Sequence, residues 1–377
     1  NAEMENVSCL ETTATNANFT LANMQRAKFL GSNLSGSNLD SANLRKSIFL
    51  EANLSKCNLN EADLSNSDFS RTDMSHATIV ESNLSRGRFN GANLESVDFT
   101  DSRLSMAVFF EANFKNANLN RAQVKGAKLA GGTFENTSLP RADITGADLT
   151  DAKFLNSNLS RAKLNGAILR RTDLKGSDLS EADLSIADLT GASMIEVKLI
   201  GANMERIKLN QAKLPGAQLC GAKINKAKLV QVDLSKADLS GANLTGADLT
   251  ESNLQDCDLS RANLTEAILQ KANMKSTFLI GANLQKADLT EVNLEEANIA
   301  GTKLGKANFQ KANMKKVDLQ RSDLEHADFT QADLTEANLT GSKLGDAYFK
   351  NANLTGADLS LADTTDTDFS DAKGYNS

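Results

Sequence analysis

The chain repeats a five-residue unit, and this period constrains its fold more than any other feature. Every fifth residue from Phe19 to Leu359 is Leu, Phe, Met, Ile or Val, and Phe369 resumes the series after the lone exception, Thr364. The segment 237–249 shows the simplest unit: a small residue, Asp or Asn, Leu, and two further residues. Self-similarity at a fixed period predicts one elongated array, although a length of 377 residues would otherwise suggest two or three domains.

A period of five matches neither the helix repeat of about 3.6 residues nor the strand repeat of about 2, so the chain must bend in every unit. The central apolar residue and the residue two before it are both uncharged, and side chains two apart on a strand share a face. We therefore expect three extended residues, with the Asp or Asn pointing outward, followed by two turn residues. The small inward position holds only uncharged residues, of which Ile207 is the largest, because an unpaired buried charge would cost several kcal/mol.

The spacing of phenylalanines predicts how many units close one turn of the coil. Three series of phenylalanines have a spacing of 20 residues: Phe29 to Phe109, Phe114 to Phe154 and Phe309 to Phe369. Four units per coil would stack these rings one strand spacing apart, about 4.8 Å, whereas three units would favour spacings of 15. The series therefore predict four sides and roughly 18 coils.

The motif Ala-(Asp/Asn)-Leu-x-x, which runs through residues 17–372, resembles that of the pentapeptide-repeat proteins. The resemblance implies an all-β fold, a right-handed quadrilateral β-helix with stacked inward Leu or Phe and four flat faces. On this basis we expect an irregular N-terminal cap or ragged first coil over 1–18, a single pentapeptide-repeat β-helix over 19–372, and a C-terminal tail over 373–377. An open β-helix end exposes strand edges, which a short turn or another copy of the chain would cover, so an end-to-end homodimer is one expected partner arrangement.

Residues with catalytic or metal-binding chemistry are sparse. The two histidines, His76 and His326, fall on different faces many coils apart, and the four cysteines have no metal-ligand spacing. We predict no enzyme activity, no cofactor, no metal and no small-molecule substrate.

The cysteines and the hydropathy pattern indicate the cellular compartment in which we expect the protein. Cys57 and Cys257 take the small inward position and Cys220 an outward corner, which favours free thiols and a reducing, cytoplasmic compartment. No apolar run reaches the length of a membrane span or signal peptide. Because residue 1 is not Met, the alternative that a targeting segment has been removed stays open.

Sorting the outward residues by column yields three candidate partner-binding surfaces. A basic strip in the column centred on Met24 and Leu44 could meet an acidic protein or a nucleic-acid backbone, and a solvated charged face is the alternative. In the column centred on Phe19 and Leu39, three arginines stack on successive coils, where like charges repel. An apolar group in the column centred on Phe29 and Phe49 could be an interface or simply loosely covered residues. The three groups are Arg26, Arg45, Lys46, Arg86 and Arg103; Arg121, Arg141 and Arg161; and Leu30, Leu50 and Phe110.

These surfaces predict a non-catalytic interaction rod that presents flat faces to a protein partner. The family resemblance implies an alternative, a DNA mimic that binds DNA gyrase or topoisomerase IV, but acids and bases are intermixed and the unbroken period leaves no projecting loop. A further alternative is the repeat module of a bacterial effector or targeting protein. With a net charge of −7, composition gives no reason to expect a nucleic-acid partner.

Overall fold

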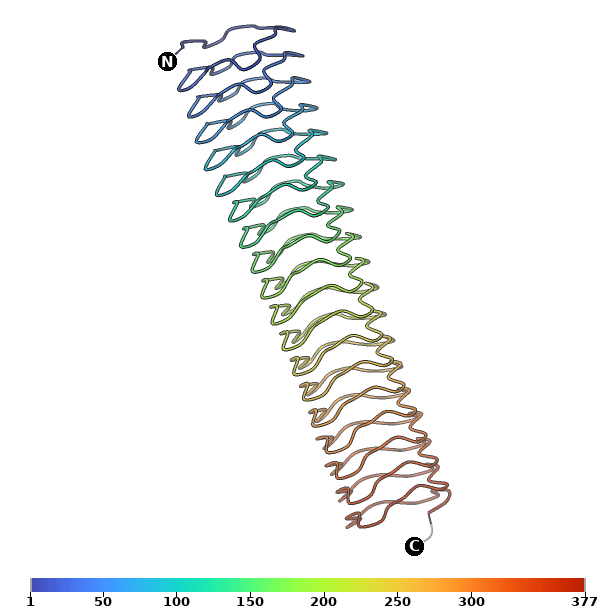
Figure 1. Cartoon of the computed structure of the whole chain (residues 1–377). Coiled ribbons are helices and arrows are strands. Elements are labelled where there is room, and N and C mark those ends of the chain that lie inside the picture. The colour runs from blue at the N-terminus through green and yellow to red at the C-terminus, as the bar shows by residue number, and fades with distance from the viewer. Residues whose placement is uncertain (1, 376–377) are drawn as a thin grey trace. The chain divides into compact units, whose positions relative to one another are not determined.

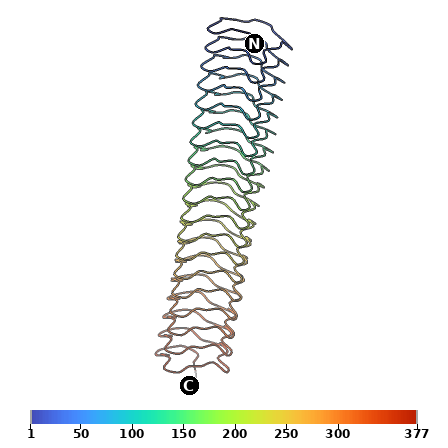
Figure 2. The same ribbon diagram turned by 90° about the vertical axis from the view of Figure 1, so that its left-hand side faces the viewer.

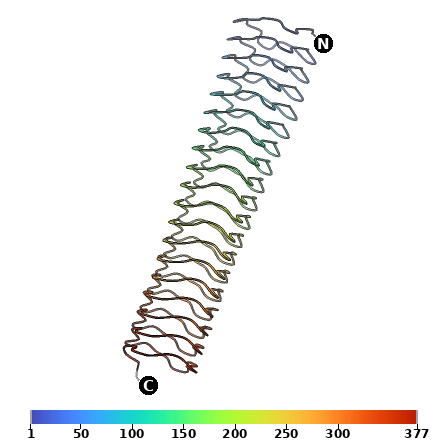
Figure 3. The same ribbon diagram turned by 180° about the vertical axis from the view of Figure 1, so that it is seen from behind.

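The computed structural model describes residues 2–375. The chain divides into two compact units, Asn1–Ala192 and Ser193–Ser377. In each unit the backbone winds into stacked coils of similar outline (Figure 1), and the same stacking is visible from the side and from behind (Figures 2 and 3). The described residues contain no helix, and their strands are single bridge residues, one in each five-residue unit.

Bridge residues pair in parallel with residues 20 positions farther along the chain. In the first unit the pairs run from Glu3 with Asn23 to Ile168 with Asp188, and in the second from Ser193 with Lys213 to Asn353 with Lys373. A separation of 20 residues means four five-residue units per coil. The predicted quadrilateral β-helix is therefore confirmed, and the count of roughly 18 coils stays a prediction.

Each five-residue unit closes a turn and bonds to the coils on both sides. In the unit centred on Leu44, the Asn43 amide donates back to the preceding coil, while the Leu44 and Lys46 amides donate to Asp63 O (2.8 Å) and Ser65 O (3.1 Å) of the next coil. The Ser47 amide donates to Leu44 O at 3.2 Å, which closes a β-turn. Lys46, the second central residue of this turn, has φ = +59°, the pattern of a type II turn.

The interior consists of the central apolar residues and the small inward residues. Both sets are buried through most of each unit, and Ile207 is also fully buried. The predicted ring ladders are confirmed: centroids are 4.8–5.2 Å apart from Phe29 to Phe109, 4.4–4.6 Å from Phe114 to Phe154, and 4.6–5.1 Å from Phe309 to Phe369. The rings stack because identical positions on successive coils lie one strand spacing apart.

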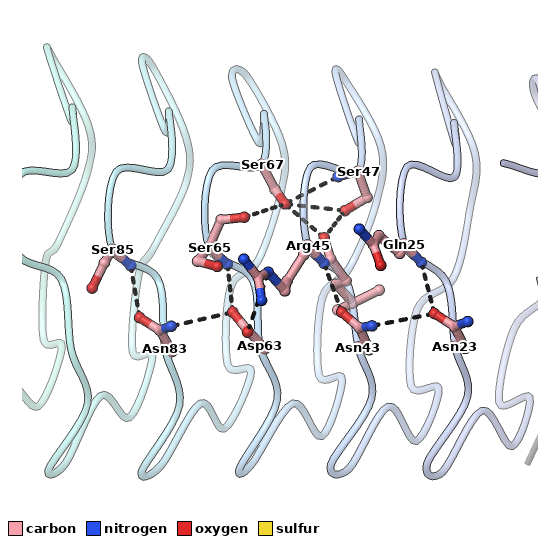
Figure 4. Close-up of polar contacts among 11 residues, drawn as sticks. Asn23, Gln25, Asn43, Arg45, Ser47, Asp63, Ser65, Ser67, Asn83 and Ser85 are labelled. Atoms are coloured by element: carbon pink, nitrogen blue, oxygen red, sulfur yellow. Dashed lines mark hydrogen bonds and ion pairs between the residues drawn. The ribbon is translucent and has the colours of Figure 1, made fainter. Parts of the chain in front are cut away.

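Buried serine and threonine hydroxyls in the small inward position bond to the carbonyls of central residues. Ser67 Oγ donates to Leu44 O of the preceding coil at 2.6 Å, and Ser47 Oγ donates to the same carbonyl (Figure 4). Ser252 Oγ is the exception: it is buried and has no hydrogen-bond partner among the described residues. A serine or threonine can thus replace alanine in the core where its hydroxyl can donate to a backbone carbonyl.

The outward Asp and Asn side chains hold the turns together. Asp63 Oδ1 accepts from the Ser65 amide at 3.0 Å, two residues later, and from Asn83 Nδ2 of the next coil at 3.2 Å (Figure 4). Asn43 Nδ2 donates to Asn23 Oδ1 at 3.2 Å in the same column. This position therefore requires a short side chain with an acceptor oxygen, which explains why the repeat places Asp or Asn there.

The two ends of the repeat differ from its interior. Glu3 already pairs with Asn23, but the central residues Met4 and Cys9 of the first coil are only half-buried. At the other end, Gly374 has φ = +81° and the ring of Tyr375 stacks on Phe369 with a centroid distance of 3.8 Å, which covers the last ring of that ladder. The predicted bounds of the cap (1–18) and tail (373–377) stay predictions, and residues 1 and 376–377 lie outside the described residues.

Candidate interaction surfaces

The three predicted arginines lie together at one corner of the first unit. Arg121, Arg141 and Arg161 each occupy the second turn position, with φ = +58°, and their amides bond to the neighbouring coil. The turn directs all three side chains outward from successive coils, so the guanidinium groups form one row. We refer to this row as the arginine corner.

Acidic residues engage the two outer arginines and leave the middle one without an ionic partner. Arg121 forms a two-pronged ion pair with Asp101, and Arg161 forms one with Glu181 at 2.9 and 3.0 Å. Hydrogen bonds from these guanidinium groups lower the pKa of Asp101 and of Glu181 below their ordinary values. Among the described residues, nothing pairs with the exposed Arg141 side chain.

A shallow depression of about 410 Å³ runs along the arginine corner. The three arginines line it together with Pro140, the hydroxyl-bearing residues Ser160 and Ser180, Asn120 and Glu181. The depression thus combines one unpaired guanidinium, two ion-paired arginines, the carboxylate of Glu181 and two hydroxyl groups. This arrangement suits an anionic group because guanidinium binds carboxylate and phosphate in a bidentate manner.

The predicted basic strip is split in the structure. Arg26, Arg45 and Lys46 lie on adjacent coils, but Arg45 is 3.7 Å from Asp63 (Figure 4). Arg86 follows in the same corner column only after Asn66. Arg103 lies at a bridge position between Asn83 and Gln123, in a depression that also contains Glu81 and Asp101. The structure therefore joins the first three residues but not all five.

The predicted apolar residues form one column with polar residues between them. Leu30 and Leu50 are half-buried neighbours, and Ser70 and Asn90 separate them from Phe110, which is 40% exposed. Leu50 and Phe110 still line one open hollow of about 590 Å³ with Arg71 and Glu111. The hollow has charged rims, so the apolar surface is not continuous.

His326 Nδ1 lies 3.7 Å from Asp346 Oδ2, and the four cysteines are free thiols. In the part of the chain that the structure describes, no three His, Cys, Asp or Glu residues gather as metal ligands would. The predicted inward positions of Cys57 and Cys257 are confirmed, and burial raises the pKa of their thiols to about 11 and about 12. Such thiols are protonated at neutral pH and therefore poor nucleophiles.

The sorting into columns missed one basic cluster, in the second unit. Lys208 bridges directly to Lys228, and Arg206 and Lys226 occupy the adjoining corner on the same two coils. All four side chains are exposed. The signal was present in the sequence, because residues 206–232 contain six bases and no acid. We refer to Arg206, Lys208, Lys226 and Lys228 as the lysine cluster.

Two family descriptions match the chain. Pentapeptide repeats match segments that together cover 2–54 and 117–371, and a pentapeptide repeat region matches 52–129. A search of curated proteins found no match. The described residues contain no helix long and apolar enough to cross a membrane.

Several solved structures are similar to this chain. HetL, a pentapeptide repeat protein involved in heterocyst differentiation regulation in the cyanobacterium Nostoc sp. strain PCC 7120, is 29% identical over 65% of this chain and 90% of its own, with a TM-score of 0.25. QnrB1, a plasmid-mediated fluoroquinolone resistance protein, is 18% identical over 49% of this chain and 92% of its own, with a TM-score of 0.26. A pentapeptide repeat protein of the Arabidopsis thaliana thylakoid lumen is 26% identical over 26% of this chain and 65% of its own, with a TM-score of 0.19.

The matched segments extend over nearly the whole sequence, and the coil of four five-residue units agrees with them. Both the sequence repeats and the bridge pattern lead to the same conclusion: this chain belongs to the pentapeptide-repeat family.

Proposed function

We propose that this protein is a non-catalytic interaction module that binds an acidic segment of a protein partner at the arginine corner. The observation that supports the proposal is the unpaired Arg141 guanidinium in a depression between two further arginines. Like charges that lie directly opposite on neighbouring coils repel one another and are destabilising. The acids at the two ends of the row offset this repulsion for Arg121 and Arg161 only.

A carboxylate of the partner would complete the row. The planar guanidinium of Arg141 can donate two parallel hydrogen bonds to one carboxylate, and Ser160 and Ser180 add hydroxyl donors beside it. Because the depression is open, the ligand is a side chain on a surface rather than a small molecule enclosed by protein.

A binding experiment with matched variants tests the proposal. Arg141→Glu reverses the unpaired charge of the row, whereas Arg171→Glu reverses an arginine at the same turn position that is ion-paired with Asp151 on another corner. We expect proteins captured by the wild-type chain to be lost with Arg141→Glu and kept with Arg171→Glu. Equal capture by all three chains would refute the role of the arginine corner.

The gyrase-binding alternative calls for a surface dominated by acids, as in a DNA mimic. Along the corners, however, bases lie next to acids, as in the pairs Glu51 with Arg71 and Asp151 with Arg171. This alternation supports the interaction module instead. A gyrase supercoiling assay with and without quinolone separates the two functions, since a DNA mimic would change the supercoiling at micromolar protein and the proposed module would not.

A further inference from the structure

We infer that the lysine cluster of the second unit is a second binding site, specific for a phosphorylated serine or threonine in an exposed segment of a protein partner. The inference is independent of the arginine corner because the two sites share no residue. It starts from the unusual placement of bases on adjacent coils.

At the other described bridges of the two units, each base is paired with an acid or a neutral residue. In the second unit, Lys303 and Lys343 flank Asp323, and Lys213 lies beside Asp233. Lys208 with Lys228 is the one pair among the described bridges that sets base beside base. Arg206 and Lys226 repeat the same juxtaposition in the adjoining corner, with backbones in the left-handed region at φ = +54° and +55°.

In the described structure the cluster has more bases than acids around it. The lysines of the cluster take part in no ion pair there, and Arg206 has only a distant contact of 3.9 Å with Glu205. Asp248, on the next coil, pairs as a bridge residue with Lys228, but its Oδ1 accepts from the amide and hydroxyl of Thr250. Four exposed cations thus lie beside two carboxylates, those of Glu205 and Asp248, and the surface keeps a net positive charge.

The size of the cluster points to a phosphate group rather than to a nucleic-acid backbone. Two coils stack about 4.8 Å apart, so the four flexible side chains can converge on one point. A phosphomonoester carries a charge of about −2 and three strong acceptor oxygens, which match four converging cations better than a single carboxylate does. The cluster ends at the next coil, where Gly246 and Asp248 replace Lys226 and Lys228, so it offers no continuing row of cations for successive phosphates.

The surroundings favour a peptide over a free anion. The four side chains are exposed, so no wall encloses a small ion. On the opposite side of Lys208 and Lys228, the exposed Gln211 and Gln231 form an amide ladder in which Gln211 Nε2 donates to Gln231 Oε1 at 3.2 Å. Gln231 Nε2 in turn donates to Glu251 Oε2 at 2.9 Å, and each amide keeps a second N–H. Amide groups of this kind can bond to a peptide backbone that runs across the face from a phosphate held by the lysine cluster.

Fluorescence anisotropy with the full chain tests the inference. The probe is a dye-labelled peptide of glycine and serine residues with one phosphoserine, compared with its unphosphorylated copy. The double substitution Lys208→Gln and Lys228→Gln should weaken binding of the phosphopeptide about tenfold, as expected when charge-assisted hydrogen bonds are lost. The matched control, Lys303→Gln with Lys343→Gln, changes two exposed bridge lysines of the same unit that flank Asp323, and should leave binding unchanged.

Three results would overturn the inference. One is equal binding of the phosphorylated and unphosphorylated peptides, and another is equal binding by the two double variants when both melt as the wild type does. The third is competition by inorganic phosphate, or by an oligothymidylate of equal charge, at concentrations as low as those of unlabelled phosphopeptide. Equal capture in the Arg141→Glu experiment would refute the arginine corner without bearing on any of these three results, so the two proposals fail separately.

Discussion

At the scale of single residues, hydrogen bonds decide which departures from the repeat are tolerated. A hydroxyl replaces Ala in the small inward position when a carbonyl of a central residue can accept from it, as Ser322 Oγ does with Ile299 O at 2.8 Å. The hydroxyl of Ser252 lacks such a partner. Since an unsatisfied buried hydroxyl costs about 1–3 kcal/mol, the two serines should respond in opposite ways to truncation.

We predict that Ser252→Ala raises the free energy of unfolding by about 1 kcal/mol, because Ala is the ordinary residue at this position and no hydrogen bond is lost. Ser322→Ala, which removes a satisfied hydroxyl, should lower it by a similar amount. Thermal melts of the two variants measure the difference. A Ser252→Ala variant that melts below the wild type would contradict the prediction.

The outward Asp residues make stability depend on pH. Burial alone would raise the pKa of Asp68, but hydrogen bonds from the Ser70 hydroxyl, the Arg88 guanidinium and the Ser70 amide outweigh it and lower the pKa below the ordinary 3.8. A carboxyl whose pKa is lowered in the folded state stabilises the protein above the unfolded pKa and loses that contribution as the pH falls through the folded value. Asp68→Asn should therefore lower the melting temperature at pH 7, and the difference from the wild type should shrink below about pH 4. A difference that is constant from pH 7 to about pH 2 would argue against this account.

At the scale of the coil, the sequence predicted the core well and the corners less well. Spacing alone placed Phe69 between Phe49 and Phe89, because inward position follows from the period. The left-handed second turn position was not predicted, because residues as different as Arg121, Glu181 and glycine occupy it. Pairing along a column depends on which side chains reach each other.

In the candidate site, too, the repeat predicts the positions of the residues, whereas the ion pairs depend on the side chains. The row of three arginines followed from a spacing of 20, and Asp101 and Glu181 lie in the same column one coil before and after it. The two acids at the ends of the row could thus be read from the sequence, but which arginine stays unpaired depends on side-chain geometry. The lysine cluster spans a corner and the next face, so sorting by single columns divided it.

The ring ladders give a prediction for the core of the coil. Phe69 lies 4.9 Å from Phe49 and 5.2 Å from Phe89, between centroids. Phe69→Ala should lower the free energy of unfolding by about 3–5 kcal/mol, because it leaves a cavity and removes two stacked contacts. Phe69→Leu restores the ordinary central residue and should cost much less, about 1 kcal/mol. Denaturant titration of the two variants measures both losses, and equal losses would contradict the prediction, because they would show that Leu cannot replace the ring between Phe49 and Phe89.

At the scale of the whole molecule, stability depends on whether a coil has neighbours on both sides. Interior coils donate and accept along both edges, whereas bridge amides of the first coil, such as Ser8 and Thr13, have no preceding coil to bond to among the described residues. At the opposite end, the amides of Leu359, Leu361 and Phe369 form no backbone hydrogen bond within the part of the chain that the structure describes. In a repeat array each coil is stabilised mainly by its neighbours, so opening should begin at these edges.

We predict a gradient of amide hydrogen exchange. The amides of 3–18 and 359–371 should exchange fastest, with opening free energies close to zero, and those in the interior of each unit slowest. Hydrogen exchange with mass spectrometry at two protein concentrations also tests the predicted end-to-end homodimer. If copies pair through their open edges, the amides of Leu359, Leu361 and Phe369 become protected as concentration rises, while the interior is unaffected. Exchange at these amides that is independent of concentration would exclude pairing through this edge, and uniform protection along the chain at low concentration would contradict the neighbour-dependent stability itself.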